Sequence, residues 1–337
     1  MRVAIIGAGS WGTALAIHAA RAGHDALLWS RNAGVVDSIN RDRMNPKYLL
    51  DAEIPENVRA TKDIAEAIKT AELVVLAAPS HATRELLSSF ANTIRAGAVL
   101  VSATKGVEVD TGKRISEIVA ESFPNVPKPA FVCLSGPSFA KEVVEKHPTA
   151  VVAASINQDA ANLTQRALSF ESFRIYTNDD VTGAELGGSI KNVMAIAAGM
   201  VNGLGYGSNS VAALITRGLA EMTRLAIAEG AKSETMMGLA GLGDLVLTCT
   251  GKLSRNRFVG EELGKGRSLT EITSGMNEIA EGVKTTRAVQ LLADRKRIEM
   301  PITNEVHSVL YEGKPVREAA ESLMARPLKV EGITREV

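Results

Sequence analysis

Three glycines near the start of the chain, Gly7, Gly9 and Gly12, have the spacing of a phosphate-binding turn. They follow the apolar run 3–6 and open an amphipathic stretch that ends at Gly23. In a strand–turn–helix unit the first glycine allows the tight turn, the second lets the backbone approach a pyrophosphate, and the third allows close packing of the helix. The pyrophosphate then faces the positive end of that helix. The pattern therefore predicts a dinucleotide site, and the alternative is a Gly-rich turn without a ligand.

The residues about 20 positions after this turn bear on which dinucleotide is bound. An NAD-selective site of this type places Asp or Glu there, and the carboxylate binds the ribose 2′-hydroxyl. The sequence instead has Trp-Ser-Arg-Asn at 29–32. The guanidinium of Arg31 suits a 2′-phosphate, which predicts NADP(H) as the preferred cofactor and NAD(H) as the other candidate. Alternatively, Arg31 stacks on the adenine or lies in solvent.

Two lysines occur where a proton donor or an anion site could form. Lys191 lies in 183–201, a helical stretch that is otherwise mostly small and apolar. Burial there would disfavour the ammonium form and lower the pKa toward neutrality, as a general acid/base requires. Lys105 follows the apolar run 99–102 and could polarise a substrate oxygen or hold a phosphate. The alternatives are a lysine that points to water from its helix and a surface lysine at the edge of a sheet.

Three further segments carry polar groups in Gly-rich or loop sequence. Asp244 follows Gly-Leu-Gly at 241–243, and Arg255 lies in the basic segment 254–257. A guanidinium matches the oxygens of a phosphate, so Arg255 is a candidate anion ligand. The segment 136–140 could offer backbone N–H groups to a substrate or to the nicotinamide. Each segment also has a structural interpretation, as a capped turn, a solvated basic loop or a helix cap.

The elements that must position these residues change type near residue 180. Before it, short β-branched or apolar runs alternate with stretches of helix length, which predicts a doubly wound, mostly parallel α/β sheet of Rossmann type. After it the periodicity is helical, which predicts an all-helical domain. The predicted domains are 1–180 for the dinucleotide and 181–337 for the substrate and catalysis. The predicted strands are 3–6, 26–29, 73–77, 99–102, 131–134, 150–153 and 173–176, and the long predicted helices are 183–201, 210–229 and 278–293.

Composition narrows the class of partner. The 337 residues exceed what one hydrophobic core usually serves, and Lys plus Arg equal Asp plus Glu at 38 each, so no overall field favours nucleic acid or an anionic membrane. No apolar segment approaches the roughly 20 residues of a membrane span. We therefore expect a small-molecule substrate and a protein of the cytoplasm. We expect no metal, because Cys133 and Cys249 form no CxxC pair and the histidines show no ligand spacing. The histidines are His18, His24, His81, His147 and His307.

Together these segments resemble the NAD(P)-dependent glycerol-3-phosphate dehydrogenases of the soluble bacterial type. The resemblance extends over almost the whole chain in the order of the family's motifs, and the elements GSIKNV, GLGDL and SRN are its most specific parts. The matching segments are GAGSWGTALA at 7–16, APSHA at 78–82, SATKGVE at 102–108, SGPSFAKEV at 135–143, GAELGGSIKNVMAIAAG at 183–199, GLGDLVLTCTG at 241–251 and SRNRFVG at 254–260.

The resemblance implies reduction of dihydroxyacetone phosphate to sn-glycerol 3-phosphate, a homodimer, and a role in phospholipid synthesis. It makes Lys191 the general acid/base. The implied substrate ligands are Lys105, Gly136, Ser138, Asn192, Asp244, Thr248, Ser254, Arg255 and Asn256. The implied cofactor ligands, besides the three glycines, are Ser10, Trp11, Arg31, Lys105, Ala140, Arg255, Ile279 and Glu281, although the motif is loose around 279–281.

Two other functions are compatible with the same two-domain plan. One is a different dehydrogenase, such as a ketopantoate reductase or a hydroxyacyl-CoA dehydrogenase, which would need other groups in place of GSIKNV and GLGDL. The other is an NADP-sensing module without turnover, which should lack a group such as Lys191. The sequence retains these elements and therefore favours the glycerol-3-phosphate dehydrogenase.

Overall fold

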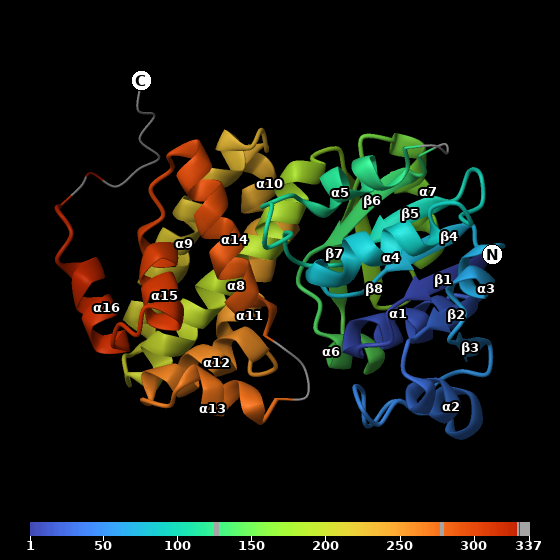
Figure 1. The fold of residues 1–337 in the computed structure, drawn as a ribbon, viewed down its shortest axis with the longest axis horizontal. Coiled ribbons are helices and arrows are strands. Elements are labelled where there is room, and N and C mark those ends of the chain that lie inside the picture. Colours follow the sequence, from blue (N-terminus) through green and yellow to red (C-terminus); the bar gives the residue numbers. More distant parts are fainter. Residues whose placement is uncertain (125–127, 277–279, 329, 331–337) are drawn as a thin grey trace.

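The computed structural model describes residues 1–124, 128–276, 280–328 and 330, and it contains an eight-stranded sheet beside a group of helices (Figure 1). The strand order is β3-β2-β1-β4-β5-β6-β7-β8, and all neighbours are parallel except β6 and β7. The predicted Rossmann-type α/β fold with a helical second half is confirmed. The strands are β1 (Arg2–Ile6), β2 (Asp25–Trp29), β3 (Val58–Thr61), β4 (Leu73–Leu76), β5 (Val99–Ser102), β6 (Ala130–Ser135), β7 (Thr149–Ala154) and β8 (Phe173–Asn178).

Every strand expected from the sequence is present, and β3 is the one that sequence patterns missed. Its four residues, Val-Arg-Ala-Thr, include the exposed Arg59, and β3 lies at the edge of the sheet. A strand so short, with a charged residue inside it, gives no apolar run to detect. Its place is determined by pairing with β2.

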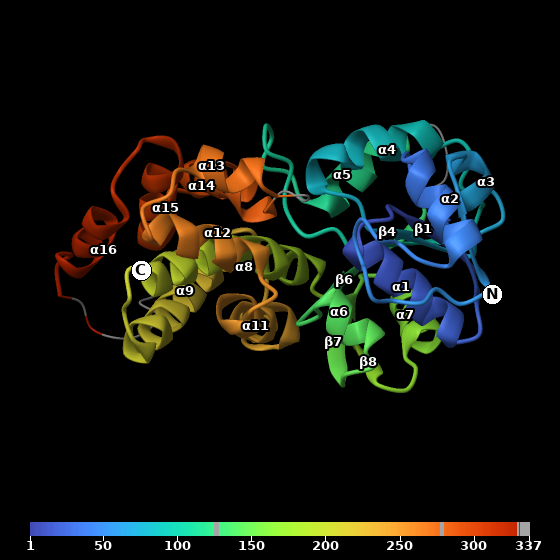
Figure 2. The ribbon, with the colours of Figure 1, turned by 90° about the horizontal axis from the view of Figure 1, so that it is seen from below.

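Helices cover both faces of the sheet (Figure 2). Along β1, Val3 and Ile5 join the core formed with α1 and α7, whereas Ala4 and Ile6 join the core formed with α3, α4 and α5. This alternation follows from the pleat, which points successive side chains to opposite faces. The helices of this half are α1 (Ser10–Arg21), α2 (Ala33–Asp42), α3 (Ile64–Ile68), α4 (Thr83–Phe90), α5 (Ile115–Ser122), α6 (Ala140–Val144) and α7 (Gln158–Leu168), with a 3₁₀ turn η1 (Ser80–Ala82).

The second half is built around α8 (Val181–Gly203), which is buried from Gly183 to Met200. The helices expected at 183–201 and 210–229 are confirmed; that expected at 278–293 corresponds to α14, and residues 278 and 279 lie outside the described residues. The division into domains at 180 and 181 stays a prediction. The other elements are α9 (Ser208–Ala228), α10 (Ser233–Met237), the π-helical turn η2 (Leu239–Gly243), α11 (Asp244–Thr250), α12 (Arg255–Gly264), α13 (Leu269–Ser274), α14 (Glu281–Lys296), α15 (Pro301–Tyr311) and α16 (Val316–Met324).

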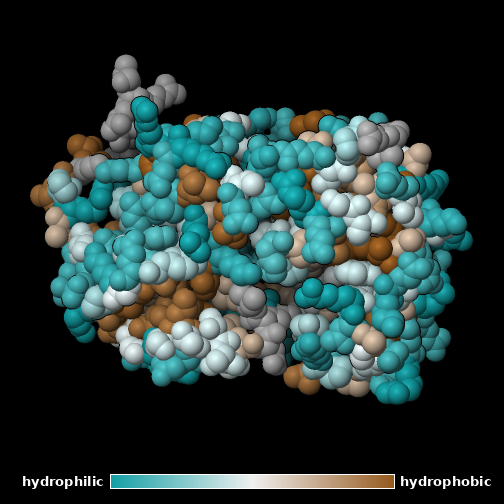
Figure 3. Space-filling model, viewed as in Figure 1, coloured by the Kyte–Doolittle hydropathy of each residue, from teal (hydrophilic) through white to brown (hydrophobic). Residues whose placement is uncertain are grey.

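The surface of the molecule is mainly hydrophilic on the face drawn in Figure 3, with hydrophobic side chains gathered on the helical half. Within the described ranges, no helix has the length and apolar character needed to cross a membrane.

Helices α8 and α12 approach each other backbone to backbone through glycines. A Cβ atom on Gly199 of α8 would lie 2.0 Å from the carbonyl oxygen of Arg257, and one on Gly260 of α12 would lie 1.9 Å from that of Ile196. Neither distance is compatible with a side chain. These glycines therefore bring the start of α12 close to the middle of α8.

Replacement of Gly199 by Ala should destabilise the protein by about 1–3 kcal/mol, because the methyl group forces the two helices apart. Thermal or urea unfolding would measure the loss. The control is Gly275→Ala, where the nearest atom to the new Cβ is the Ile272 carbonyl oxygen at 3.9 Å. Equal stability of both variants would contradict the close contact.

Candidate active site

The glycine-rich turn after β1 has the geometry that a dinucleotide phosphate requires. Gly7 has a positive φ of 119°, and a Cβ atom there would lie 2.7 Å from the carbonyl oxygen of Ala77. A Cβ atom on Gly12 would lie 1.8 Å from the carbonyl oxygen of Gly7. Gly9 precedes α1 and no side chain caps this helix, so its first N–H groups remain available to an anion. The turn fits the pyrophosphate of a dinucleotide.

Two lysines meet on one buried carboxylate at the carboxyl edge of the sheet. Lys191 Nζ donates to Asp244 Oδ1 at 2.5 Å and to Thr248 Oγ1 at 2.7 Å. Lys105 Nζ donates to Asp244 Oδ2 at 2.8 Å and to the carbonyl oxygen of Gly136 at 3.2 Å. Four predicted site residues, Lys105, Lys191, Asp244 and Thr248, are thus brought together from three separate parts of the chain.

The electrostatics of this cluster move the pKa of Lys191 toward neutrality. Lys191 is 4% exposed, and burial lowers its pKa to about 8, helped by the positive charge of Lys105 and opposed by Asp244. Burial alone would raise the pKa of Asp244, but the two lysines hold it below its usual value. The cluster therefore combines an ionised carboxylate with an ammonium group that can release its proton near neutral pH.

Local backbone features explain why these groups meet. Lys191 lies in the middle of α8, and the π-helical turn η2 delivers Asp244 to it as the first residue of α11. Gly187 of α8 makes room for this turn, since a Cβ atom there would lie 2.4 Å from the carbonyl oxygen of Ala240. Thr248 follows one helical turn after Asp244 and donates to its carbonyl oxygen at 2.6 Å.

Beside this cluster, the start of α12 presents the candidate phosphate ligands. Ser254 caps the helix by accepting from the Arg257 N–H at 3.2 Å, and Arg255 is exposed in the first turn. Asn256 Nδ2 donates to Asn192 Oδ1 at 3.0 Å, and Asn256 Oδ1 accepts from the Gly282 N–H at 2.9 Å. These bonds tie α8, α12 and α14 together around the predicted phosphate site.

Two family models together match most of the chain. The N-terminal model of NAD-dependent glycerol-3-phosphate dehydrogenase matches residues 2–161, and the C-terminal model matches residues 180–321. The chain belongs to this family.

Close relatives span the whole length of this family member. A glycerol-3-phosphate dehydrogenase [NAD(P)+] of Koribacter versatilis is 51% identical over 98% of both chains, and one of Chlorobium limicola is 46% identical over 98% of this chain and 99% of its own. The crystal structure of glycerol-3-phosphate dehydrogenase from Coxiella burnetii superimposes with a TM-score of 0.92 at 41% identity, covering 96% of this chain and 99% of that one.

The remaining candidate cofactor ligands of this dehydrogenase lie around the glycine-rich turn and at the sheet edge. Ser10 Oγ donates to the carbonyl oxygen of Tyr48 at 2.7 Å. Trp11 Nε1 is buried without an acceptor among the described residues, which fits a ligand oxygen. Arg31 is exposed two residues after β2, Ala140 begins α6, and Ile279 lies outside the described residues.

Glu281 and Ser138 are two further predicted ligands for which the structure gives partners or electrostatic neighbours. Burial raises the pKa of Glu281 to about 7, against the effect of the nearby Arg255. Ser138 Oγ donates to the carbonyl oxygen of Gly136 at 3.0 Å, the same oxygen that Lys105 contacts. Lys105 and Ser138 thus both contact Gly136, and the roles of all three as substrate ligands stay predictions.

Glu185 is a residue of α8 that sequence analysis missed. Its buried carboxylate accepts from the Ser116 N–H at 2.8 Å and from Ser116 Oγ at 2.6 Å, and so joins α8 to the start of α5. A charged residue in the small, apolar stretch 183–201 was the available signal, as it was for Lys191. The carbonyl oxygen of Tyr48, which accepts from Ser10, could not be identified from the sequence, because every residue type has a backbone carbonyl.

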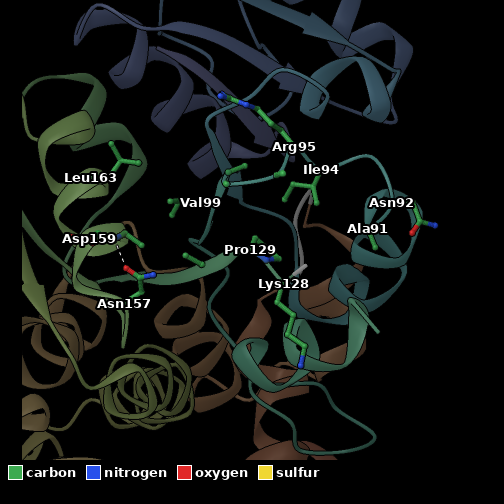
Figure 4. A pocket seen from close by; sticks show the side chains of 15 residues that line it. Ala91, Asn92, Ile94, Arg95, Val99, Lys128, Pro129, Asn157, Asp159 and Leu163 are labelled. Carbon is green, nitrogen blue, oxygen red and sulfur yellow. Dashed lines mark hydrogen bonds between the residues drawn. The ribbon is translucent and has the colours of Figure 1, made fainter. Parts of the chain in front are cut away.

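A cavity at the opposite edge of the sheet is separate from this site (Figure 4). It has a volume of about 450 Å³ and lies at the starts of β5 and β6, and its lining includes Ile94, Val99, Pro129 and Leu163. None of the predicted site residues lines it. Over the described residues, no three His, Cys, Asp or Glu side chains gather as a metal site would require, and the expectation of no metal stays a prediction.

Replacement of Asp244 by Asn should move the pKa of Lys191 further below about 8. The carboxylate is the group that raises this pKa against burial and against the charge of Lys105. NMR titration of lysine labelled at Cε would follow the change. The control is Asp294→Asn, at an exposed position on α14, which should leave the pKa of Lys191 unchanged. An unchanged or higher pKa in Asp244→Asn would contradict the cluster's electrostatics.

Proposed function

We propose that the chain reduces dihydroxyacetone phosphate to sn-glycerol 3-phosphate with NAD(P)H, and that Lys191 is the general acid/base. The observation that carries the proposal is Lys191 itself, which is buried on α8, held by Asp244 and Thr248, and has a pKa of about 8. A group with this pKa can both give and take a proton at physiological pH.

In the reduction, Lys191 supplies the proton and the protein positions the ketone. The bound nicotinamide supplies the hydride. As the carbonyl carbon gains an electron pair, a proton moves from Lys191 Nζ to the C2 oxygen, which becomes the hydroxyl group of the product. In the reverse direction the neutral amine accepts that proton. Asp244 and Thr248 hold the amine in place in both forms, and Lys105 keeps the carboxylate ionised.

Positive charge from the sheet edge and from the helical half would neutralise the substrate phosphate, which carries close to two negative charges. Arg255 lies in the first turn of α12, where the helix dipole adds to its charge. We assign the phosphate to Ser254, Arg255 and Asn256, and the hydroxyl and carbonyl oxygens to Lys105, Asn192 and Thr248. The turn at Gly136 and Ser138 contacts Lys105 of the second group through the carbonyl oxygen of Gly136.

For the cofactor, we propose that NADP(H) is preferred and that NAD(H) is also used. The glycine-rich turn suits the pyrophosphate of either dinucleotide. The preference rests on Arg31, which occupies the position after β2 where NAD-selective sites carry a carboxylate.

We further propose that the enzyme works in the cytoplasm as a homodimer and supplies glycerol phosphate for phospholipid synthesis. Cys133 and Cys249 are both buried free thiols, which suits a reducing compartment. Large hydrophobic side chains are exposed on the helical half, in keeping with an interface there (Figure 3). They include Tyr206, Ile227, Tyr311 and Met324.

Replacement of Lys191 by Ala should lower kcat about 10²- to 10⁴-fold, because the proton donor is lost. The assay is the fall in nicotinamide absorbance when the protein is mixed with dihydroxyacetone phosphate and NADPH or NADH. The dissociation constant for NADPH should stay within about twofold of wild type by calorimetry, since the glycine-rich turn is untouched.

The exposed Lys69→Ala is the control and should keep full activity. If the wild-type protein binds NADPH but does not oxidise it with any triose phosphate, the result would support the NADP-sensing module instead. A Lys191→Ala variant that turns over normally would remove Lys191 from the mechanism.

Replacement of Arg255 by Gln should lower kcat/KM for dihydroxyacetone phosphate by about tenfold to a hundredfold, through loss of a charged hydrogen bond to the phosphate. The kcat/KM for unphosphorylated dihydroxyacetone should fall little, because this ketone lacks the group that Arg255 binds. Arg267→Gln, at an exposed arginine beyond the other end of α12, is the matched control. Equal losses with both ketones would contradict phosphate recognition by Arg255.

A further inference from the structure

A group of basic side chains lies at the carboxyl edge of the sheet, beside the loop after β5 that also carries Lys105. It comprises Arg31 after β2, His81 in the turn after β4, and Lys284 in the first turn of α14, and the charges of Arg31 and Lys284 both act on His81. Burial lowers the pKa of His81, and the positive charges of Lys284 and Arg31 lower it further. No carboxylate among the described residues acts on His81 in the opposite sense. Cations gathered without an acid are unfavourable unless an anion binds between them.

Backbone geometry places Lys284 beside the turn that carries His81. A Cβ atom on Gly106 would lie 2.9 Å from Ser80 Oγ and 3.6 Å from Thr285 Oγ1. Ser80 and Thr285 therefore both lie next to Gly106, which brings the turn η1 that carries His81 close to the start of α14 that carries Lys284. The start of α14 is fixed there because the Gly282 N–H donates to Asn256 Oδ1 at 2.9 Å.

Strand register brings Arg31 to this edge as well. Ile6 is paired with Trp29 of β2 on one side and with Leu76 of β4 on the other, so both strands end level with β1. The residues after them, including Arg31 and His81, emerge on the carboxyl edge beside the glycine-rich turn. The adenosine half of a dinucleotide lies over this part of such a sheet.

We propose that Lys284 binds the 2′-phosphate of NADP(H) together with Arg31, with His81 as a hydrogen-bonding neighbour. Cofactor selectivity is then determined by both halves of the molecule, since Arg31 follows a strand of the sheet and Lys284 belongs to a helix of the second half. The inference rests on the proposed use of NADP(H) and adds a residue that the glycine-rich fingerprint does not contain.

The test compares equilibrium binding of NADP+ and NAD+, which differ only in the 2′-phosphate, by calorimetry in the absence of substrate. Lys284→Gln should weaken NADP+ about tenfold, the loss expected for one charged hydrogen bond, and change NAD+ less than about twofold. Lys284→Arg keeps the charge and should retain most of the NADP+ affinity. Lys296→Gln, at the other end of α14 where the lysine pairs with Glu229, is the matched control and should change neither.

Each other outcome overturns the inference in a distinct way. Equal weakening of both dinucleotides would move Lys284 to the shared diphosphate, and no weakening of either would remove it from the site. Arg31→Gln, measured in parallel, separates this inference from the proposed cofactor preference. If Arg31→Gln selectively weakens NADP+ and Lys284→Gln does not, the preference stands and the role of Lys284 fails. Turnover of wild-type protein with dihydroxyacetone phosphate tests the function independently of both variants.

Discussion

The site depends on one buried carboxylate that two lysines share. Asp244 is fully buried, and a lone charge at such a place would be strongly unfavourable. Lys105 comes from the loop after β5 and Lys191 from α8, so the carboxylate links the sheet to the helical half. Because neither lysine could approach the other without it, assembly of the site and packing of the two halves are the same structural event.

The balance of charge in this centre matches an anionic ketone. Two lysines and one carboxylate leave a net positive charge, and Arg255 adds a second close by. Glu281 opposes it only in part, because burial raises its pKa to about 7 and it is partly protonated near neutral pH. A phosphate group on the substrate supplies negative charge that an uncharged ketone of the same shape would lack.

Much of the fold and part of the candidate site could be predicted from local sequence, whereas the other features depend on tertiary contacts. The glycine-rich turn, the parallel strands and the helical second half follow from spacing and periodicity, and Lys191 stood out because it is charged within an apolar helix. The pairing of Lys105 with Asp244 was not predictable from patterns, since 139 residues separate them and the contact depends on the turn η2. Strand β3 was missed because its four residues include a charged one and give no apolar run, and the bond from Ser116 to Glu185 was missed because 69 residues separate the two.

The start of α14 connects the two ligand sites. Asn256, next to the candidate phosphate ligand Arg255, accepts from the Gly282 N–H, and Lys284, the proposed dinucleotide ligand, lies in the same helical turn as Gly282. In the proposed arrangement, the substrate phosphate binds Arg255, and the 2′-phosphate of the dinucleotide binds Arg31 and Lys284. A dinucleotide that holds the first turn of α14 against the sheet also holds Asn256, and through it Asn192 on α8. The first turn of α14 therefore belongs to both candidate sites.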